Sequence, residues 1–249
     1  MLLEGRIAVI SGAASPRGIG LATTRLFAKH GAKVAILDLN QDAAEKAAES
    51  VGPGHIGVAC DVTNPEACKQ AIAKVIDRLG PIDILVNNAG LTQPLKIMDI
   101  DPKSWGLVLD VNLSGVLNLS QAVIPHMRSR GKGSIACMSS VSAQRGGGIF
   151  GGPHYSAAKA GVLGLAKAMA RELGPDGVRV NCVAPGLIQT DITGGLLTDE
   201  MKKKILEGIP LNRLGVADDV ANIFLFLASD LSAYVTGSVL DVNGGMLIH

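Results

Sequence analysis

The chain has 249 residues, of which 47% are hydrophobic but only 3% aromatic, with 31 glycines and a formal net charge of +1. This composition excludes a disordered chain and predicts one domain over residues 1–249, with tight aliphatic packing. The balanced charge excludes a broad positively charged surface for binding nucleic acid or an anionic membrane, so we expect a small-molecule partner. Charged residues lie too near the start of the sequence for a secretory segment, and no apolar run is long enough to span a membrane. We therefore expect a soluble, cytoplasmic protein.

Short aliphatic runs alternate with longer helical patterns along the whole chain. The expected strands are residues 7–11, 34–38, 55–60, 82–87, 134–139, 179–183 and 238–242. Apolar strands separated by helices imply right-handed crossovers and a sheet covered on both faces. The sequence therefore predicts an α/β fold, a doubly wound (Rossmann) parallel sheet of about seven strands in a three-layer α/β/α arrangement.

A glycine-rich loop over residues 11–20 follows the first strand and opens the first helix. In this context the backbone can approach a pyrophosphate closely, and the positive helix end favours the anion. We expect contacts to a dinucleotide from Gly12, Ser15, Arg17, Gly18, Ile19 and Gly20.

The second strand ends in Asp38, followed by Leu39. A carboxylate about twenty residues beyond such a loop can accept hydrogen bonds from the adenosine ribose. Asp38 would repel a 2′-phosphate, which favours NAD over NADP. Arg17 could instead grip that phosphate, but it can equally serve the pyrophosphate or pair with Asp38. We expect NAD, with NADP as the alternative.

The four cysteines, Cys60, Cys68, Cys137 and Cys182, lie far apart without metal-ligand spacing. We expect reduced structural thiols and no metal site.

Tyr155 and Lys159 are four residues apart, which is about one helical turn. This spacing places the phenol and the ammonium on the same face of a helix. An ammonium about 4 Å from a phenol at an effective dielectric near 20 contributes roughly 4 kcal/mol, or about three pKa units. The tyrosine could then shuttle protons near neutral pH. The alternative is a half-buried ring beside a solvated amine.

Residues 190–211 form the least regular stretch. Gly194 and Gly195, followed by an amphipathic piece over residues 201–206, predict a substrate flap. An ordinary surface helix is the alternative.

With the glycine loop, Asn87-Asn88-Ala89-Gly90 and the Tyr155/Lys159 pair in this order, the chain resembles the short-chain dehydrogenase/reductase family over essentially its whole length. The resemblance implies an NAD(P)-dependent oxidoreductase, often a homotetramer. It also implies that Asn112 interrupts its helix and helps hold a proton-relaying water. The cofactor contacts it implies are Asp61, Val62, Asn88, Ala89, Gly90, Tyr155, Lys159, Pro185, Gly186, Ile188 and Thr190.

Two departures from the family pattern affect the site. The phosphate loop carries two extra residues near Pro16 and Arg17. The family spacing to Tyr155 would select Ser142 as the catalytic serine, whereas the pattern at the strand end selects Ser140. We choose Ser140 and attribute the difference to a longer loop over residues 145–152.

The resemblance implies that Tyr155 exchanges a proton with the substrate oxygen, Ser140 stabilises that oxygen, and Lys159 lowers the Tyr155 pKa and anchors the nicotinamide ribose. The predicted function is NAD-dependent interconversion of a secondary alcohol, such as a polyol or sugar alcohol, and its ketone. One alternative is NADPH-dependent reduction of a 3-oxoacyl thioester, and another is a non-catalytic dinucleotide sensor. An acyl carrier protein could dock on Arg128, Arg130, Lys132, Arg171, Lys202, Lys203 and Lys204.

Overall fold

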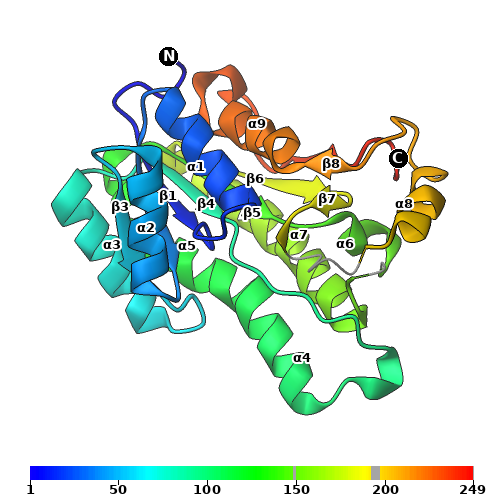
Figure 1. Cartoon of the computed structure of the whole chain (residues 1–249). Coiled ribbons are helices and arrows are strands. Elements are labelled where there is room, and N and C mark those ends of the chain that lie inside the picture. The colour runs from blue at the N-terminus through cyan, green and yellow to red at the C-terminus, as the bar shows by residue number, and fades with distance from the viewer. Residues whose placement is uncertain (148–149, 192–196, 249) are drawn as a thin grey trace.

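The aliphatic runs of the sequence form one parallel sheet in a computed structural model that describes residues 1–147, 150–191 and 197–248 (Figure 1). Its seven strands have the order β3-β2-β1-β4-β5-β6-β9, and every neighbouring pair is parallel. The predicted fold class and all seven predicted strands are confirmed. The strands are β1 Ile7–Ser11, β2 Lys33–Asp38, β3 Ile56–Ala59, β4 Ile84–Asn87, β5 Gly133–Met138, β6 Val178–Pro185 and β9 Val239–Val242.

Helices cover both faces of this sheet. On one face, the buried side chains of α1 (Ile19–Lys29), α2 (Gln41–Val51) and α9 (Ala217–Ala228) pack in one core with Ile36. On the other, α3 (Pro65–Leu79), α5 (Gly115–Arg130) and α7 (Pro153–Leu173) share a second core with Leu37. Because successive residues of a strand point to opposite faces, an uninterrupted apolar run such as β2 supplies both cores.

A single helical stretch carries α4 (Pro102–Leu109), a π-helical turn (Asp110–Ser114) and α5. By length and composition alone, this stretch is apolar enough to cross a membrane, a criterion that the core helices of water-soluble proteins also meet. In this fold α5 buries Val116, Leu119, Val123 and Met127 in the core beneath the sheet. The apolar side chains of α5 are therefore explained by sheet packing.

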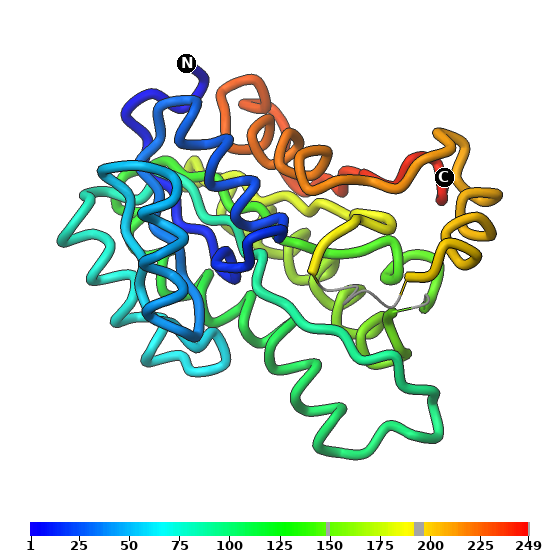
Figure 2. Tube along the Cα trace, in the orientation of Figure 1, coloured from blue at the N-terminus to red at the C-terminus, as the bar shows by residue number. Residues whose placement is uncertain are grey.

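The carboxyl end of the sheet is completed by short elements that no sequence pattern indicated. β7 (Ile188–Gln189) and β8 (Gly215–Val216) form a separate parallel pair, and α6 (Val141–Arg145) follows β5. α8 (Asp199–Leu206) lies within the predicted flap, whereas Gly194 and Gly195 lie outside the described residues. Figure 2 follows the C-terminal tail back to the segment after α8, where Leu211 N–H donates to the Gly244 carbonyl at 3.1 Å.

Gly57 in β3 packs directly against the backbone of α2. A Cβ at this position would lie 2.2 Å from the amide nitrogen of Glu45 and 2.3 Å from the carbonyl carbon of Ala44. We therefore expect Gly57→Ala to lower the free energy of unfolding by about 1–3 kcal/mol, because the helix has to move away from the sheet. Denaturant titration measures the change.

The matched control is Gly174→Ala, since a Cβ at Gly174 meets no atom within 4 Å. Its unfolding free energy should change by less than about 1 kcal/mol. Equal losses for both variants would contradict the proposed clash with α2.

Candidate active site

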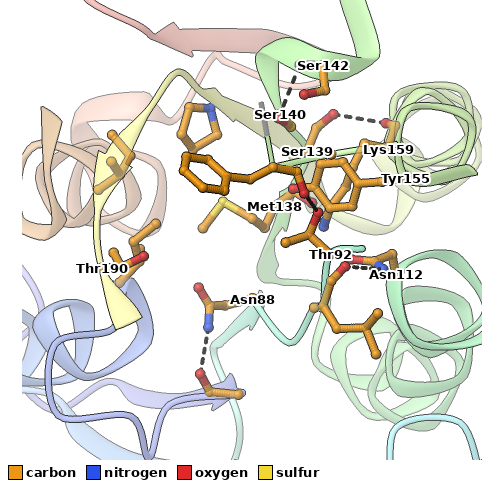
Figure 3. Close-up of a pocket in the computed structure, with 18 of the residues that line it drawn as sticks. Asn88, Thr92, Asn112, Met138, Ser139, Ser140, Ser142, Tyr155, Lys159 and Thr190 are labelled. Carbon is orange, nitrogen blue, oxygen red and sulfur yellow. Dashed lines mark hydrogen bonds between the residues drawn. The ribbon is translucent and has the colours of Figure 1, made fainter. Parts of the chain in front are cut away.

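The carboxyl ends of the parallel strands open on a cavity of about 670 Å³. Figure 3 shows side chains from several of these strand ends and from α7 pointing into the same space. Every predicted site residue lines this cavity except Arg17 and Gly20. The lining predicted residues are Gly12, Ser15, Gly18, Ile19, Asp38, Leu39, Asp61, Val62, Asn88, Ala89, Gly90, Asn112, Ser140, Tyr155, Lys159, Pro185, Gly186, Ile188 and Thr190.

The glycine-rich loop lies in direct contact with the segment after β4. Gly12 has φ +62°, and a Cβ there would lie 2.6 Å from the Cα of Ala89. Gly20 is buried beneath the loop, where a Cβ would lie 2.7 Å from the Cα of Ala13. The Asn88 amide donates to the carbonyls of Ser11 and Gly12 at 2.9 and 2.8 Å, so it holds the loop in place.

Asp38 connects the second strand to the same loop. Its Oδ2 accepts a hydrogen bond from the Ala14 N–H at 3.0 Å, and its Oδ1 accepts one from the Leu39 N–H at 2.9 Å. The carboxylate also lines the cavity. Asp38 therefore orders the loop and presents negative charge to the cavity.

The Arg17 side chain pairs with Asp191 rather than with Asp38. Its Nε lies 2.5 Å from Oδ1 of Asp191, while Oδ2 of Asp191 accepts from the Ser15 hydroxyl at 2.7 Å and from the Arg17 N–H at 3.2 Å. The hydrogen bonds from Ser15 and then Arg17 lower the pKa of Asp191. Sequence analysis missed Asp191, although it directly follows Thr190 of a recognised motif.

The end of β3 supplies the other wall of the loop region. Asp61 Oδ1 accepts from the N–H and the hydroxyl of Thr63 at 2.9 and 2.7 Å, which sets the turn before α3.

All four cysteines are buried free thiols, with the Cys60 and Cys68 sulfurs 4.0 Å apart. Among the described residues, no group of three His, Cys, Asp or Glu side chains is placed to hold a metal ion.

Three of the predicted catalytic side chains meet at the far end of the cavity (Figure 3). Tyr155 and Lys159 lie one turn apart on α7, and Ser140 caps the amino end of α6. The side chain of Ser140 lies near enough to Tyr155 to lower its pKa. Lys159 Nζ lies 5.7 Å from the centre of the Tyr155 ring and donates to the Met138 carbonyl at 2.9 Å.

The predicted lowering of the Tyr155 pKa by Lys159 is wrong for this structure. Burial raises the Tyr155 pKa, and the nearby Ser140 side chain only partly opposes this. The ammonium is directed at the Met138 carbonyl rather than at the phenol oxygen. Burial also lowers the pKa of Lys159 itself, to about 8.

The structure brings Ser140, and not Ser142, to the tyrosine. Ser142 lies in α6, where its N–H donates to the Ser140 hydroxyl at 3.1 Å. Both serines line the cavity, and the choice of Ser140 as the catalytic serine stays a prediction. Part of the longer loop invoked for that choice, residues 148–149, lies outside the described residues.

Asn112 lies in the π-helical turn, so the expected local interruption of its helix is present. Its amide donates to the Leu91 and Val108 carbonyls, both at 2.9 Å, while its buried Oδ1 has no hydrogen-bond partner among the residues that the structure describes. A Cβ on Gly90 would lie 2.8 Å from this oxygen and 3.4 Å from Lys159 Nζ. Both polar groups thus approach the same glycine.

Further lining residues come from segments without a recognisable motif. The Thr92 hydroxyl donates to the Phe150 carbonyl, which ties the segment after β4 to the loop before α7. α8 contributes Lys204 and Ile205. Lys204 and Ile205 belong to the predicted flap over residues 190–211. No sequence signal could place Thr92 and Phe150, because their segments are far apart in the chain and meet only in the folded protein.

Residues 12–247 match the family described as enoyl-(acyl carrier protein) reductase. The chain is 67% identical over 253 residues to an uncharacterized short-chain type dehydrogenase/reductase of Sinorhizobium fredii, covering all of both chains. It is 44% identical over 255 residues to a 3-oxoacyl-[acyl-carrier-protein] reductase of Thermotoga maritima, again covering all of both. A crystal structure of a short-chain type dehydrogenase/reductase from Mycobacterium marinum matches with a TM-score of 0.93 at 33% identity, covering 99% of this chain and 97% of that chain.

The buried ammonium of Lys159 predicts a pH-dependent stability. Because its pKa falls from 10.5 to about 8 on folding, the unfolded chain binds more protons than the folded chain between these pH values. The unfolding free energy of the wild type, relative to that of Lys159→Met, should be lowest below pH 8 and rise by about 3 kcal/mol towards pH 10.5. Denaturant titrations across this range measure the difference.

Lys167→Met is the control, because it removes an exposed ammonium from the same helix. Two results would contradict a destabilised charge at Lys159. In one, the unfolding free energy of the wild type relative to Lys159→Met falls as the pH rises, and in the other it changes with pH as it does for the control.

Proposed function

This chain belongs to the short-chain dehydrogenase/reductase family of oxidoreductases, and on that premise we propose that it interconverts a secondary alcohol and its ketone with NAD. The observation that supports this most directly is the convergence of Ser140, Tyr155 and Lys159 on a cavity whose other end is the glycine-rich loop. A neighbouring serine and tyrosine can hold one substrate oxygen and move one proton to or from it.

The loop residues fit the dinucleotide that the family uses. A side-chain carboxylate, that of Asp191, is already held by the Ser15 hydroxyl and the Arg17 N–H, which are donors that a phosphate can use in the same way. Asp38 would accept from the adenosine ribose, and Ile188 with Thr190 would hold the carboxamide. When bound, the nicotinamide supplies the hydride acceptor or donor.

Tyr155 carries the proton in this proposal. With its pKa raised by burial, its phenol stays protonated at neutral pH and is ready to donate to a ketone oxygen. Ser140 hydrogen-bonds the same oxygen and stabilises the negative charge that develops there. In the oxidation direction the phenolate accepts the hydroxyl proton.

Lys159 and Asn112 provide the route by which Tyr155 recovers its proton. The unpartnered Asn112 Oδ1 and the Lys159 Nζ lie on the same side of Gly90. We propose that a water held by this oxygen passes protons to and from the ammonium. The π-helical turn serves this role because it directs a buried amide oxygen away from the helix.

The proposed choice of NAD rests on two charged side chains. Asp38 presents its carboxylate where the adenosine ribose would lie, and it would repel a 2′-phosphate. Arg17, the cation that could offset this repulsion, is paired with Asp191.

Reduction of a 3-oxoacyl thioester is the second candidate, supported by relatives named 3-oxoacyl-[acyl-carrier-protein] reductase in Thermotoga maritima and, at 41% identity, in Escherichia coli. The cationic patch suggested for a carrier protein is weaker than the sequence implied. Arg128 pairs with Glu172 and Asp176 at 2.9 and 2.6 Å, and Arg130 pairs with Asp83 at 2.7 Å. A non-catalytic sensor is disfavoured by the presence of Ser140, Tyr155 and Lys159 in one cavity.

We also propose a cytoplasmic homo-oligomer, a tetramer by family resemblance, whose other partner is the small-molecule substrate. Large apolar side chains are exposed along the segment that includes α4 and the start of α5, which a second copy of the chain could cover. They are Ile97, Met98, Trp105, Leu107 and Leu117. Light scattering on the purified protein measures the assembly.

A substrate panel tests the proposed activity. Secondary alcohols are mixed with NAD, and small ketones or an acetoacetyl thioester with NADH or NADPH, while the absorbance of reduced nicotinamide is followed. Turnover of alcohols and ketones with NAD(H) supports the proposal. Turnover confined to the thioester with NADPH would establish the second candidate instead.

Tyr155→Phe should lower kcat by at least about a hundredfold, because it removes the proton donor and keeps the ring. The Kd of the dinucleotide should change by less than about threefold, since the phenol oxygen faces the substrate. Steady-state kinetics and cofactor titration measure the two effects. Tyr234→Phe, at the chain's other and fully exposed tyrosine, is the matched control. Full activity in Tyr155→Phe would refute the assignment.

NAD should bind at least about tenfold tighter than NADP, and Asp38→Asn should reduce that ratio by about tenfold. The asparagine keeps an oxygen for the Ala14 N–H but removes the charge. Fluorescence titration with both cofactors measures the ratio. Asp42→Asn, which removes an exposed charge from the first turn of α2, should leave it unchanged. Equal wild-type affinities for the two cofactors would overturn the proposed selection.

A further inference from the structure

We propose that Asp191 is an internal competitor for the pyrophosphate of the cofactor, so that its carboxylate has to leave the phosphate loop before a dinucleotide binds fully. The inference rests on the proposed function and deepens it, because it concerns how the same site is filled. It assigns a role to a residue outside the recognised motifs.

Three donors of the loop converge on this one carboxylate. Oδ2 accepts from the Ser15 hydroxyl at 2.7 Å and from the Arg17 N–H at 3.2 Å, and Oδ1 lies 2.5 Å from Arg17 Nε. A hydroxyl, a backbone amide and a guanidinium together form the kind of donor set that binds a phosphate oxygen. The Asp191 carboxylate thus occupies anion-binding groups just before the amino end of α1.

The contact lies inside the cavity rather than on an unrelated surface. Both Ser15 and Asp191 line the cavity, together with Gly12, Gly18 and Ile19 of the loop. A pyrophosphate placed on these groups would bring its negative charges close to the Asp191 carboxylate, and like charges at such distances repel. The two anions therefore exclude each other from the same donors.

The position of Asp191 in the chain links its displacement to another part of the site. It directly follows Thr190 and lies two residues beyond β7, whose Ile188 also lines the cavity. Binding of the pyrophosphate would release this segment from the loop and free Arg17 to contact the ligand. Filling one end of the site is thereby linked to the segment proposed to hold the nicotinamide.

The expected effect of Asp191 on the affinity for a dinucleotide is modest, because the Arg17–Asp191 ion pair is partly solvated. The Arg17 and Asp191 side chains are 79% and 35% exposed, and ion pairs in such positions are weak. The competitor therefore lowers the affinity for a dinucleotide by a small factor without preventing binding.

The test compares Asp191→Asn with the wild type in binding to ADP-ribose, which carries the pyrophosphate but no nicotinamide. Calorimetric titration should show ADP-ribose binding about threefold to tenfold tighter to the variant, because the neutral amide competes less well for the loop. Adenosine, which has no phosphate, should bind both proteins equally in an NMR titration. Asp199→Asn is the matched control, since it removes an exposed carboxylate from the first turn of α8.

The outcomes separate the inference from the function on which it rests. Unchanged or weaker ADP-ribose binding by Asp191→Asn, or an equal gain for adenosine or in Asp199→Asn, overturns the competition while leaving dinucleotide binding intact. Failure of the wild type to bind ADP-ribose and NAD overturns the proposed function and the inference together.

Discussion

The contact between the glycine-rich loop and the segment after β4 is the constraint on which the site depends. Gly12 approaches Ala89 so closely that a single added carbon would overlap it, and the Asn88 amide bonds the two segments together. These segments follow β1 and β4, neighbouring strands whose crossovers leave in opposite directions along the sheet. A crevice forms at such a switch point. The small residues at this contact allow the two segments to approach each other closely at the strand ends.

Two carboxylates, those of Asp38 and Asp191, accept hydrogen bonds from this loop. Asp38 holds the loop through the Ala14 amide, and Asp191 takes up the donors that an anion would use. The glycine-rich loop is thus ordered by one carboxylate, while another occupies its donors. The first is the basis of the proposed choice of NAD, and the second is the basis of the proposed competition with the pyrophosphate.

At the other end of the cavity, burial rather than charge pairing dominates the chemistry. The half-buried phenol of Tyr155 has a pKa raised by desolvation, and the buried ammonium of Lys159 has a pKa lowered by desolvation. Both shifts favour the neutral forms. In the proposed reaction, such a site is set to donate a proton, whereas oxidation of an alcohol would need the phenolate. Ser140 partly offsets that cost, because it lowers the Tyr155 pKa.

Local patterns in the sequence predicted the seven-stranded parallel sheet, the glycine-rich loop, Asp38 and the Tyr155/Lys159 pair, because strand period, glycine content and helical spacing are short-range properties. They also selected Ser140 from the end of its strand. The other predicted residues that line the cavity came from the family resemblance. Only the tertiary structure decided that Arg17 pairs with Asp191, residues 174 positions apart, and that Lys159 is directed at the Met138 carbonyl. Those outcomes depend on which groups packing brings within hydrogen-bond reach and on how far it removes them from water, and no local pattern encodes either.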